Sequence, residues 1–307
     1  MRIAIDLMGG DQPPAHIYEA AAELPYEFTY IADEQTASTL TGNFVIAEET
    51  IEMGESPLFA LRRKKKSSMA VGMQLLKEKK VDALVSTGNT GALVATAMFH
   101  LTMLPGMERP ALLVIMPNGH KGTVVLDVGA NIKPKPSHLI SYAKMGATYR
   151  KLIHGIENPK VGLLNIGVEE RKGTKEVQET YQLLREAFGN NFLGNIEGRE
   201  VFDGHIDVMV TDGFTGNVFL KTCEGVSSFF IEYIHANFKT DGASEVVSHF
   251  YNRFNYDKNP GALLCGVDGI VVKCHGHSNK TALINGICGA AALVENRIIE
   301  KFRQEIA

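Results

Sequence analysis

Two polar, glycine-bearing turns carry the residue types best suited to hold an anion in this chain of 307 residues. The Thr211 turn, residues 211–217, reads Thr-Asp-Gly-Phe-Thr-Gly-Asn after an apolar segment, and the Thr87 turn, residues 87–91, reads Thr-Gly-Asn-Thr-Gly after another. The apolar spacing after each turn predicts a helix. A strand, a glycine turn and a helix in succession direct unpaired backbone N–H groups at one point, where the helix dipole favours negative charge. Either turn alone could be an ordinary connection, but the repetition favours anion binding.

Further polar residues stand where other apolar segments end. In an open parallel sheet, ligands bind outside the carboxyl ends of the strands, so these residues are expected at one edge of the sheet. Each also has a structural alternative, because Asp and Asn cap helices and shape turns. Asp212 in particular suits turn formation better than base catalysis. The candidates for binding phosphate or other substrate groups are Asp6, Gly9, Gly10, Ser86, Gly88, Asn89, Thr90, Gly91, Asp127, Asn131, Asn165, Asp212, Gly213, Thr215 and Gly216.

Cofactor motifs are missing from the sequence. Neither turn matches G-x-G-x-x-G or G-x-x-x-x-G-K-S/T, which argues against NAD and ATP. The spacing of Cys274, His275 and His277 matches no structural zinc pattern and offers no evident fourth ligand, so no metal is expected. Cys274 is also disfavoured as an acyl-bearing nucleophile, because neighbouring side chains on a strand point to opposite faces and His275 would face away from it.

Five consecutive basic residues form a second candidate site. Arg62, Arg63, Lys64, Lys65 and Lys66 make up this basic run, which precedes a predicted helix. It is either a solvated turn, as charge runs usually are, or a surface that docks an anionic partner and guides phosphate. The formal net charge of the chain is −4, which argues against a general nucleic-acid binder and makes a concentrated basic run more informative.

The periodicity of apolar residues predicts an α/β protein. Strands and helices alternate, which favours a parallel sheet with right-handed crossovers. The predicted strands cover 2–7, 28–32, 44–47, 81–86, 111–116, 123–128, 161–166, a short stretch near 192–199 and 208–210, followed by a strand pair near 261–266 and 270–274. Helices are predicted near 14–23, 69–79, 92–104, 137–154, 174–188 and 282–307, and from 218 onward. Residues 226–258 are rich in aromatic side chains and predict a protruding helical pair that breaks at 241–242, whose aromatic faces serve the core, a dimer contact or a membrane surface.

Composition is consistent with one domain over residues 1–307. Hydrophobic residues make up 45% of the chain and charged residues 21%, an ordinary globular balance. No window of eighteen apolar residues exists, so no membrane span is expected. The amino-terminal segment lacks the apolar core of a signal peptide, which predicts a cytoplasmic protein. The four cysteines form no C-x-x-C pair and are expected to be free thiols.

Eight segments in order resemble the bacterial acyl-acyl carrier protein:phosphate acyltransferase family of phospholipid synthesis, commonly called PlsX. The resemblance covers nearly the whole chain. It departs from the family pattern in a shorter segment between Gly225 and Gly261, and in His277, where a small residue is expected. The segments are Met8-Gly-Gly-Asp11, Arg62-Arg-Lys-Lys-Lys-Ser-Ser-Met69, Thr87-Gly-Asn-Thr-Gly-Ala92, Leu126-Asp-Val-Gly-Ala-Asn131, Leu163-Leu-Asn-Ile-Gly167, Gly194-Asn-Ile-Glu-Gly198, Thr211-Asp-Gly-Phe-Thr-Gly-Asn217 and His275-Gly276.

The resemblance implies a three-layer α/β/α sandwich with a mostly parallel sheet, Rossmann-like and similar to isopropylmalate dehydrogenase, in a homodimer without metal or nucleotide cofactors. It implies reversible transfer of a fatty acyl group from acyl carrier protein to inorganic phosphate. The acyl phosphate would serve a membrane glycerol-3-phosphate acyltransferase of the PlsY type, with the protein in the cytoplasm and in peripheral contact with the inner face of the cell membrane. By resemblance, Lys172 and Asn217 are the catalytic candidates.

The chemistry of this reaction fits those residue types. A thioester is already activated and phosphate is already an anionic nucleophile, so the enzyme must mainly position phosphate and stabilise the tetrahedral oxyanion. Asn217 can donate to the oxyanion and Lys172 can neutralise phosphate, although a helix cap and a surface lysine are their structural alternatives. Three other functions stay open: a phosphate acetyltransferase-like enzyme that uses acyl-CoA, an NAD-dependent dehydrogenase, which the missing motif disfavours, and a non-enzymatic carrier-protein or membrane scaffold.

Overall fold

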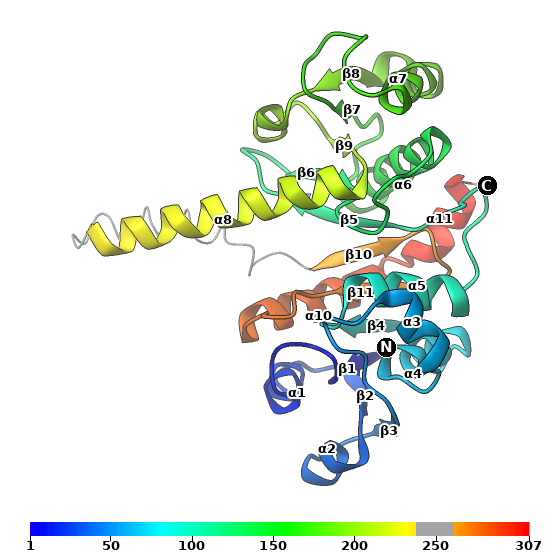
Figure 1. The fold of residues 1–307 in the computed structure, drawn as a ribbon, viewed down its shortest axis with the longest axis vertical. Helices are drawn as coiled ribbons and strands as arrows, with labels where there is room; N and C mark the ends of the chain where they lie inside the picture. Colours follow the sequence, from blue (N-terminus) through cyan, green and yellow to red (C-terminus); the bar gives the residue numbers. More distant parts are fainter. Residues whose placement is uncertain (238–260, 307) are drawn as a thin grey trace.

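The computed structural model describes residues 1–237 and 261–306, whose strands form one 11-stranded sheet with helices on both faces (Figure 1). The strands are β1 (Arg2–Asp6), β2 (Glu27–Ala32), β3 (Phe44–Ile46), β4 (Ala83–Ser86), β5 (Ala111–Met116), β6 (Thr123–Leu126), β7 (Val161–Leu164), β8 (Phe192–Ile196), β9 (Val208–Val210), β10 (Ala262–Cys265) and β11 (Ile270–Lys273). The helices are α1 (Pro14–Ala22), α2 (Glu34–Thr39), α3 (Pro57–Arg63), α4 (Ser68–Lys77), α5 (Thr90–His100), α6 (Pro136–His154), α7 (Lys175–Phe188), α8 (Gly213–Asn237), α10 (Lys280–Glu295) and α11 (Ile298–Ile306), with 3-10 turns η1 (Gly189–Asn191) and η2 (Gly198–Phe202).

The sheet consists of two parallel halves that run in opposite directions. Its strand order is β3-β2-β1-β4-β11-β10-β5-β6-β9-β7-β8. Neighbours from β3 to β11 are parallel and neighbours from β6 to β8 are parallel, but β10 is antiparallel to both β11 and β5, and β5 is antiparallel to β6. A mostly parallel sheet is therefore confirmed, together with the predicted strand pair at its centre.

This reversal corrects one expectation from the sequence. The strand-terminal residues Asp6 and Ser86 lie at the carboxyl ends of one half, whereas Asp127, Asn165 and Asp212 follow strands of the other half. Because the two halves run in opposite directions, their carboxyl ends lie at opposite edges of the sheet, and the prediction of a single polar edge is wrong. The reversal comes from the antiparallel pairing of β5 with β6, which are joined by residues 117–122, and apolar periodicity does not encode whether neighbouring strands pair parallel or antiparallel.

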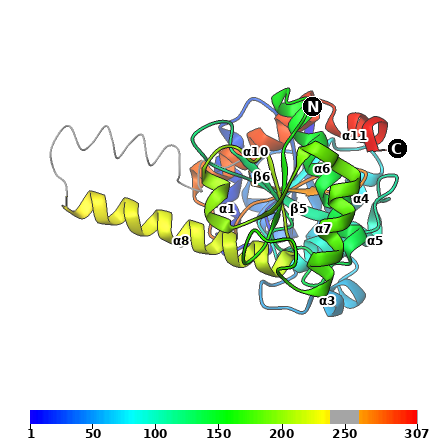
Figure 2. The same ribbon diagram turned by 90° about the horizontal axis from the view of Figure 1, so that it is seen from above.

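Helices cover both faces of the sheet and give the predicted three layers. α1, α6, α7, α10 and α11 pack over one core, and α3, α4, α5 and the first turns of α8 pack over the other (Figures 1 and 2). Successive residues of a strand enter different cores: Ile3 and Ile5 join the first, and Ala4 joins the second. Central strands are buried on both faces, so they read as continuous apolar runs in the sequence.

Several predicted boundaries shift in the structure. α8 begins at Gly213 and not at 218, because Asp212 accepts the backbone N–H of Thr215 (2.8 Å) and caps the helix, so the glycines of the Thr211 turn lie inside its first turns. The predicted closing helix is two helices, α10 and α11, separated at Arg297, whose φ is 50°.

Within residues 1–237 and 261–306, no single helix is long and apolar enough to cross a membrane. α10 and Ile298–Glu305 reach that length only as a pair bent by 56°, and one side of α10 is buried in the core.

α8 has 25 residues and extends well beyond the body of the protein (Figures 1 and 2). Its outer part carries the exposed aromatic side chains Phe229, Phe230 and Tyr233, with Phe229 in ring contact with both others. Within the predicted protrusion 226–258, residues 226–237 are a continuation of α8. The predicted break at 241–242 and the second helix lie outside the described residues.

Candidate active site

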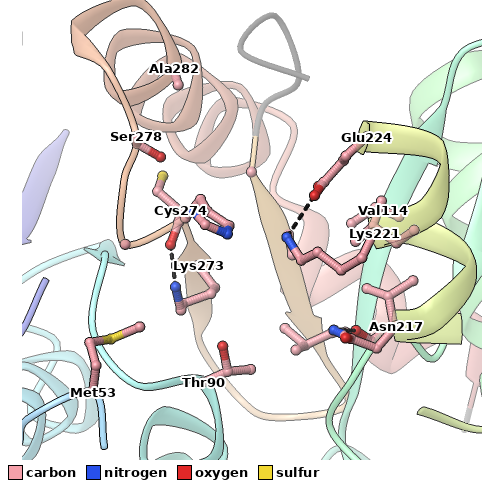
Figure 3. Close-up of a pocket in the computed structure, with 17 residues that line it drawn as sticks. Met53, Thr90, Val114, Asn217, Lys221, Glu224, Lys273, Cys274, Ser278 and Ala282 are labelled. Atoms are coloured by element: carbon pink, nitrogen blue, oxygen red, sulfur yellow. Dashed lines mark hydrogen bonds and ion pairs between the residues drawn. The ribbon is translucent and has the colours of Figure 1, made fainter. Parts of the chain in front are cut away.

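A cavity of about 180 Å³ lies on the sheet face that α5 and α8 share, over the central strands β5 and β10. Figure 3 shows Asn217, Lys221 and Glu224 of α8 on one side, Thr90 and Met53 on the other, and Lys273 between them. Both glycine-bearing turns therefore contribute to one cavity, although they follow strands of opposite halves. The lining residues are Met53, Thr90, Leu112, Val114, Val128, Asn217, Leu220, Lys221, Glu224, Gly261, Ala262, Lys273, Cys274, His275, Gly276, Ser278 and Ala282.

Asp6 fixes the turns that follow β1 and β4. The Ser86 hydroxyl donates to its carboxylate (2.7 Å), and the backbone N–H of Met8 donates to its other oxygen (3.0 Å). Gly10 permits the close packing of the two turns, since a Cβ there would lie 2.2 Å from the Thr87 Oγ1. Burial raises the pKa of the Asp6 carboxyl to about 6. Asp6 and Ser86 thus lie beneath the turn and do not line the cavity.

Within the Thr87 turn, Asn89 caps α5 and Thr90 reaches the cavity. The Asn89 carboxamide oxygen accepts the N–H of Ala92 (3.0 Å), and its nitrogen donates to the Met53 carbonyl (2.7 Å). Thr90 follows in the first turn of α5. The remaining candidates here allow close backbone approaches: a Cβ would lie 2.9 Å from the Ile51 carbonyl at Gly9, 2.3 Å from the Met69 methyl at Gly88 and 2.6 Å from Pro57 at Gly91.

The Thr211 turn is packed against the turn that follows β6. A Cβ at Gly213 would lie 2.6 Å from the Asn131 carbonyl oxygen, and one at Gly216 would lie 2.0 Å from the Asp127 carbonyl oxygen. Asp212 accepts both the backbone N–H and the hydroxyl of Thr215 (2.8 and 2.7 Å). Asp212 and Thr215 therefore form the amino-terminal cap of α8, in agreement with the turn-forming role expected for Asp212.

Asp127 organises the turn on which α8 rests. Its carboxylate accepts the backbone N–H groups of Leu112, Gly129, Ala130 and Asn131 at 2.7–3.1 Å, and also the Asn131 carboxamide (2.9 Å). Burial raises the pKa of Asp127 in spite of these bonds. Asp127 and Asn131 are both buried beneath the turn and outside the cavity lining.

Asn217 lines the cavity from the first turns of α8. Its Nδ2 donates one hydrogen bond to the Val128 carbonyl (3.1 Å). A carboxamide nitrogen has two hydrogens, so this bond orients the side chain and leaves a second donor for a ligand oxygen.

Lys172 lies in the exposed loop that follows β7. Asn165 ties this loop together by donating to the Lys172 carbonyl (3.0 Å) and accepting from Ile166 (2.8 Å). Neither Asn165 nor Lys172 is among the cavity-lining residues, and the Lys172 side chain is exposed. The catalytic role of Lys172 stays a prediction from the resemblance.

Lys273 is a cavity residue that the sequence analysis missed. It ends β11 and is only 8% exposed. Its Nζ donates to the backbone carbonyl of Thr87 (3.3 Å) and to that of Cys274. Burial lowers its pKa to about 8. A lysine that ends an otherwise apolar strand was the available signal. Lys221, also missed, forms an ion pair with Glu224 (2.6 Å).

Cys274, His275 and His277 lie near the cavity without forming a metal site. Within residues 1–237 and 261–306, no three His, Cys, Asp or Glu side chains are placed to hold a metal ion. Burial raises the pKa of Cys274 to about 11, which keeps it a thiol and weakens it as a nucleophile. The His277 Nε2 lies 3.4 Å from the Asp11 carboxylate, and burial is the main cause that lowers the pKa of His275 to about 4.

Some side chains of the basic run are paired with carboxylates and others are not, although the Arg63 guanidinium lies over the Phe59 ring (4.9 Å to its centroid). Lys64 contacts Glu55 and donates to the Thr50 carbonyl (2.5 Å), and Lys66 forms a bidentate pair with Glu48 (2.6 and 2.8 Å). Arg62, Arg63 and Lys65 are exposed, and within the described part of the chain they form no ion pair within 4.0 Å. Arg62 and Arg63 are the last residues of α3, which packs against α5, so the run lies beside the helix that begins at Thr90.

Residues 1–301 match the family described as "Fatty acid synthesis protein". Phosphate acyltransferases of Chlamydia pneumoniae and Syntrophomonas wolfei are each 41% identical to this chain; the alignments cover 98% of both chains for the first, and 100% of this chain and 99% of the other for the second. Two solved structures are similar in fold. A phosphotransacetylase of Streptococcus pyogenes has a TM-score of 0.65 at 16% identity, with 96% of this chain and 94% of that chain covered. A branched-chain phosphotransacylase of Enterococcus faecalis has a TM-score of 0.59 at 15% identity, with 96% and 99% covered.

The likeness to solved structures establishes the fold, and the matches over nearly the whole length establish the family. This chain belongs to the phosphate acyltransferase family of fatty acid synthesis proteins.

Proposed function

We propose that this cavity transfers a fatty acyl group reversibly between acyl carrier protein and inorganic phosphate. One observation carries the proposal: Thr90 and Asn217, from turns in opposite halves of the sheet, line the same cavity. Thr90 lies in the first turn of α5, whose amino-terminal N–H groups and positive dipole end favour an anion, and Asn217 contributes a carboxamide donor from α8. Apolar side chains such as Leu112, Val114 and Leu220 form the adjoining wall, which suits an acyl group.

In the proposed reaction, an oxygen of hydrogen phosphate attacks the thioester carbonyl carbon. A C–O bond forms, the carbonyl oxygen becomes an oxyanion, and the C–S bond then breaks as the oxyanion collapses. The carrier-protein thiolate leaves and takes up the proton that the hydrogen phosphate gives up, so the products are an acyl phosphate and the carrier-protein thiol. Since both reactants are already reactive, the cavity contributes mainly by holding them together and by donating hydrogen bonds to the oxyanion, where one donor contributes about 3–4 kcal/mol.

We assign the oxyanion donor to Asn217. Its bond to the Val128 carbonyl holds the carboxamide in place, and its second N–H is available for a carbonyl oxygen in the cavity. Lys172 remains the proposed second catalytic residue; its loop would have to bring the exposed ammonium to the cavity when substrate binds.

We propose that the exposed part of the basic run docks the carrier protein. Arg62, Arg63 and Lys65 carry positive charge that is not neutralised by neighbouring carboxylates in the described structure, whereas Lys64 and Lys66 are paired. The nearby Met53 lines the cavity, so a carrier protein on this surface would present its thioester near the entrance. Such charges chiefly increase the rate of encounter.

The cellular setting follows from the same proposal. An acyl phosphate is consumed by a membrane glycerol-3-phosphate acyltransferase of the PlsY type, so we place the protein in the cytoplasm, in peripheral contact with the inner face of the cell membrane. The exposed Phe229, Phe230 and Tyr233 on α8 suit either a homodimer contact or that membrane surface. We propose a homodimer without metal or nucleotide cofactors.

The test compares two acyl donors of equal chain length. The protein is incubated with phosphate and either acyl carrier protein or CoA as the thioester donor, and acyl phosphate is trapped with hydroxylamine. Formation of acyl phosphate mainly from the carrier-protein thioester supports the proposal. Turnover only with the CoA donor would favour a phosphate acetyltransferase-like enzyme, and absence of turnover with both donors would favour a scaffold.

A further inference from the structure

Lys273 is a buried cation without a carboxylate partner in the described structure. It is 8% exposed, and within residues 1–237 and 261–306 no acidic oxygen lies within 4.0 Å of its Nζ. Its hydrogen-bond acceptors are two neutral main-chain carbonyls, those of Thr87 and Cys274. Buried charges in proteins are normally paired, because an unpaired one loses its hydration without compensation. An ammonium in this setting at a cavity wall calls for an anionic ligand.

The neighbouring charges do not neutralise this ammonium. The carboxylate of Asp6 is engaged by Ser86 and Met8, and Lys221, a second cation of the cavity, is already paired with Glu224. The titratable groups that influence Lys273, from all the elements packed around it, are Asp6, Asp11, Lys221, Cys274 and His275. Within the described residues none of the carboxylates contacts the Lys273 ammonium, which has three donor hydrogens and two carbonyl acceptors, so one donor is left for an anionic ligand.

Lys273 lies beside the Thr87 turn. Its ammonium contacts the carbonyl of Thr87, the first residue of that turn, and both Lys273 and Thr90 line the cavity (Figure 3). An anion bound there would meet the lysine on one side and the amino-terminal turn of α5 on the other. Asn217 lies on the opposite wall, from which it faces the acyl carbonyl in the proposed reaction.

We propose that Lys273 binds the phosphate nucleophile directly and holds it against the Thr87 turn. This inference rests on the proposed function, to which it adds the residue that holds one substrate. The nucleophile and the oxyanion donor are then held on different walls of one cavity, so phosphate can reach the carbonyl carbon while Asn217 donates to the carbonyl oxygen.

The inference has a pH signature in the wild-type protein. Burial lowers the Lys273 pKa to about 8, so the free protein carries the charge at pH 7 and loses it as the pH rises through 8. Inorganic phosphate becomes more fully the dianion as the pH rises through this range, which by itself would strengthen binding, so any weakening reports the loss of the lysine charge. Phosphate binding should therefore weaken between pH 7.5 and 9.5. Because a bound anion favours the protonated lysine, the pKa of Lys273 should be higher in the phosphate complex than in the free protein.

The experiment measures phosphate binding and turnover in Lys273→Met. Methionine keeps the length of the side chain and removes the charge, and loss of an unpaired buried charge should leave the fold intact. We expect KM for phosphate to rise about tenfold to a hundredfold, as for loss of a hydrogen bond to a charged group. The phosphate-induced rise in melting temperature should be lost. Lys151→Met, which removes an exposed charge paired with Glu305, serves as the control and should retain both properties.

The outcomes separate this inference from the proposed function. If Lys273→Met keeps the wild-type KM and the wild-type thermal shift with phosphate, the inference is wrong while the acyl transfer stands. If the wild type transfers no acyl group from the carrier protein but shows a thermal shift that needs Lys273, the function is wrong and the phosphate site stands. Should Lys273→Met not fold, the wild-type protein decides the question. If its phosphate-induced rise in melting temperature is constant from pH 7.5 to 9.5, a titrating lysine does not bind the phosphate.

Discussion

Gly216→Ala tests the close packing that brings the Thr211 turn to the cavity. The added Cβ would lie 2.0 Å from the Asp127 carbonyl oxygen and 2.8 Å from the Thr211 methyl group. The first contact is with backbone, which cannot rotate away, so α8 and the turn after β6 must separate by about 1 Å. Asn217 is the next residue in the chain and moves with the helix.

The size of the effect follows from two opposing contributions. Overpacking costs about 1–3 kcal/mol, whereas alanine in place of glycine within a helix contributes about 0.5–1 kcal/mol of stability. Gly225 provides the matched control, because it lies on the exposed side of the same helix and a Cβ there meets nothing within 4 Å. Gly225→Ala should therefore stabilise the protein, and the difference between the two variants should equal the overpacking cost alone.

Denaturant unfolding measures the stability of the two variants, and steady-state kinetics measures their kcat. We expect Gly216→Ala to be less stable than Gly225→Ala by about 1–3 kcal/mol. Its kcat should fall about a hundredfold, since a displacement of about 1 Å at a positioned group has that effect. Gly225→Ala should keep the wild-type kcat. Equal stabilities and equal kcat values for the two variants would refute the packing argument.

The remaining predictions concern charge and catalysis. Asp6→Asn removes a carboxyl whose pKa is raised from 3.8 to about 6; the stability of the wild type relative to the variant should rise by roughly 2 kcal/mol as the pH falls from 6 to 4, and a pH-independent difference in unfolding free energy would contradict this. Arg62→Glu with Lys65→Glu should raise KM for acyl carrier protein about tenfold and flatten its salt dependence, and an unchanged salt profile would exclude docking there. Asn217→Ala should lower kcat about a hundredfold to a thousandfold with little change in KM for phosphate. Lys172→Ala should lower kcat without changing the melting temperature, because the side chain is exposed; a wild-type kcat would remove Lys172 from the mechanism.

Local sequence signals predicted most strands and helices of the fold well, whereas the three layers were expected from the family resemblance. Apolar runs such as Val208–Val210 and glycine turns such as residues 87–91 are encoded within a few neighbouring residues, and both lie where the sequence places them. The prediction of one polar edge failed because β6 pairs antiparallel with β5, which reverses β6, β9, β7 and β8 relative to the first half of the sheet. Apolar periodicity locates these strands but does not record whether neighbouring strands pair parallel or antiparallel.

The same limit explains what was missed in the site. Lys273 became a candidate only once the structure showed that its ammonium is buried beside the Thr87 carbonyl and lines the cavity. The start of α8 was misplaced because the glycines of the Thr211 turn resemble a loop in sequence. They are needed inside the helix for its close approach to the turn after β6, which is a tertiary requirement.

A crystal structure with tungstate, an anomalously scattering mimic of phosphate, tests the central claim most directly. The claim is that two turns from opposite halves of the sheet serve one cavity, in which the Thr87 turn holds phosphate and Asn217 faces the acyl carbonyl. We predict an anomalous peak inside the cavity, within hydrogen-bonding distance of the Lys273 ammonium and the Thr87 turn, and facing Asn217. Peaks confined to the basic run 62–66, with none in the cavity under conditions that saturate turnover with phosphate, would contradict the account.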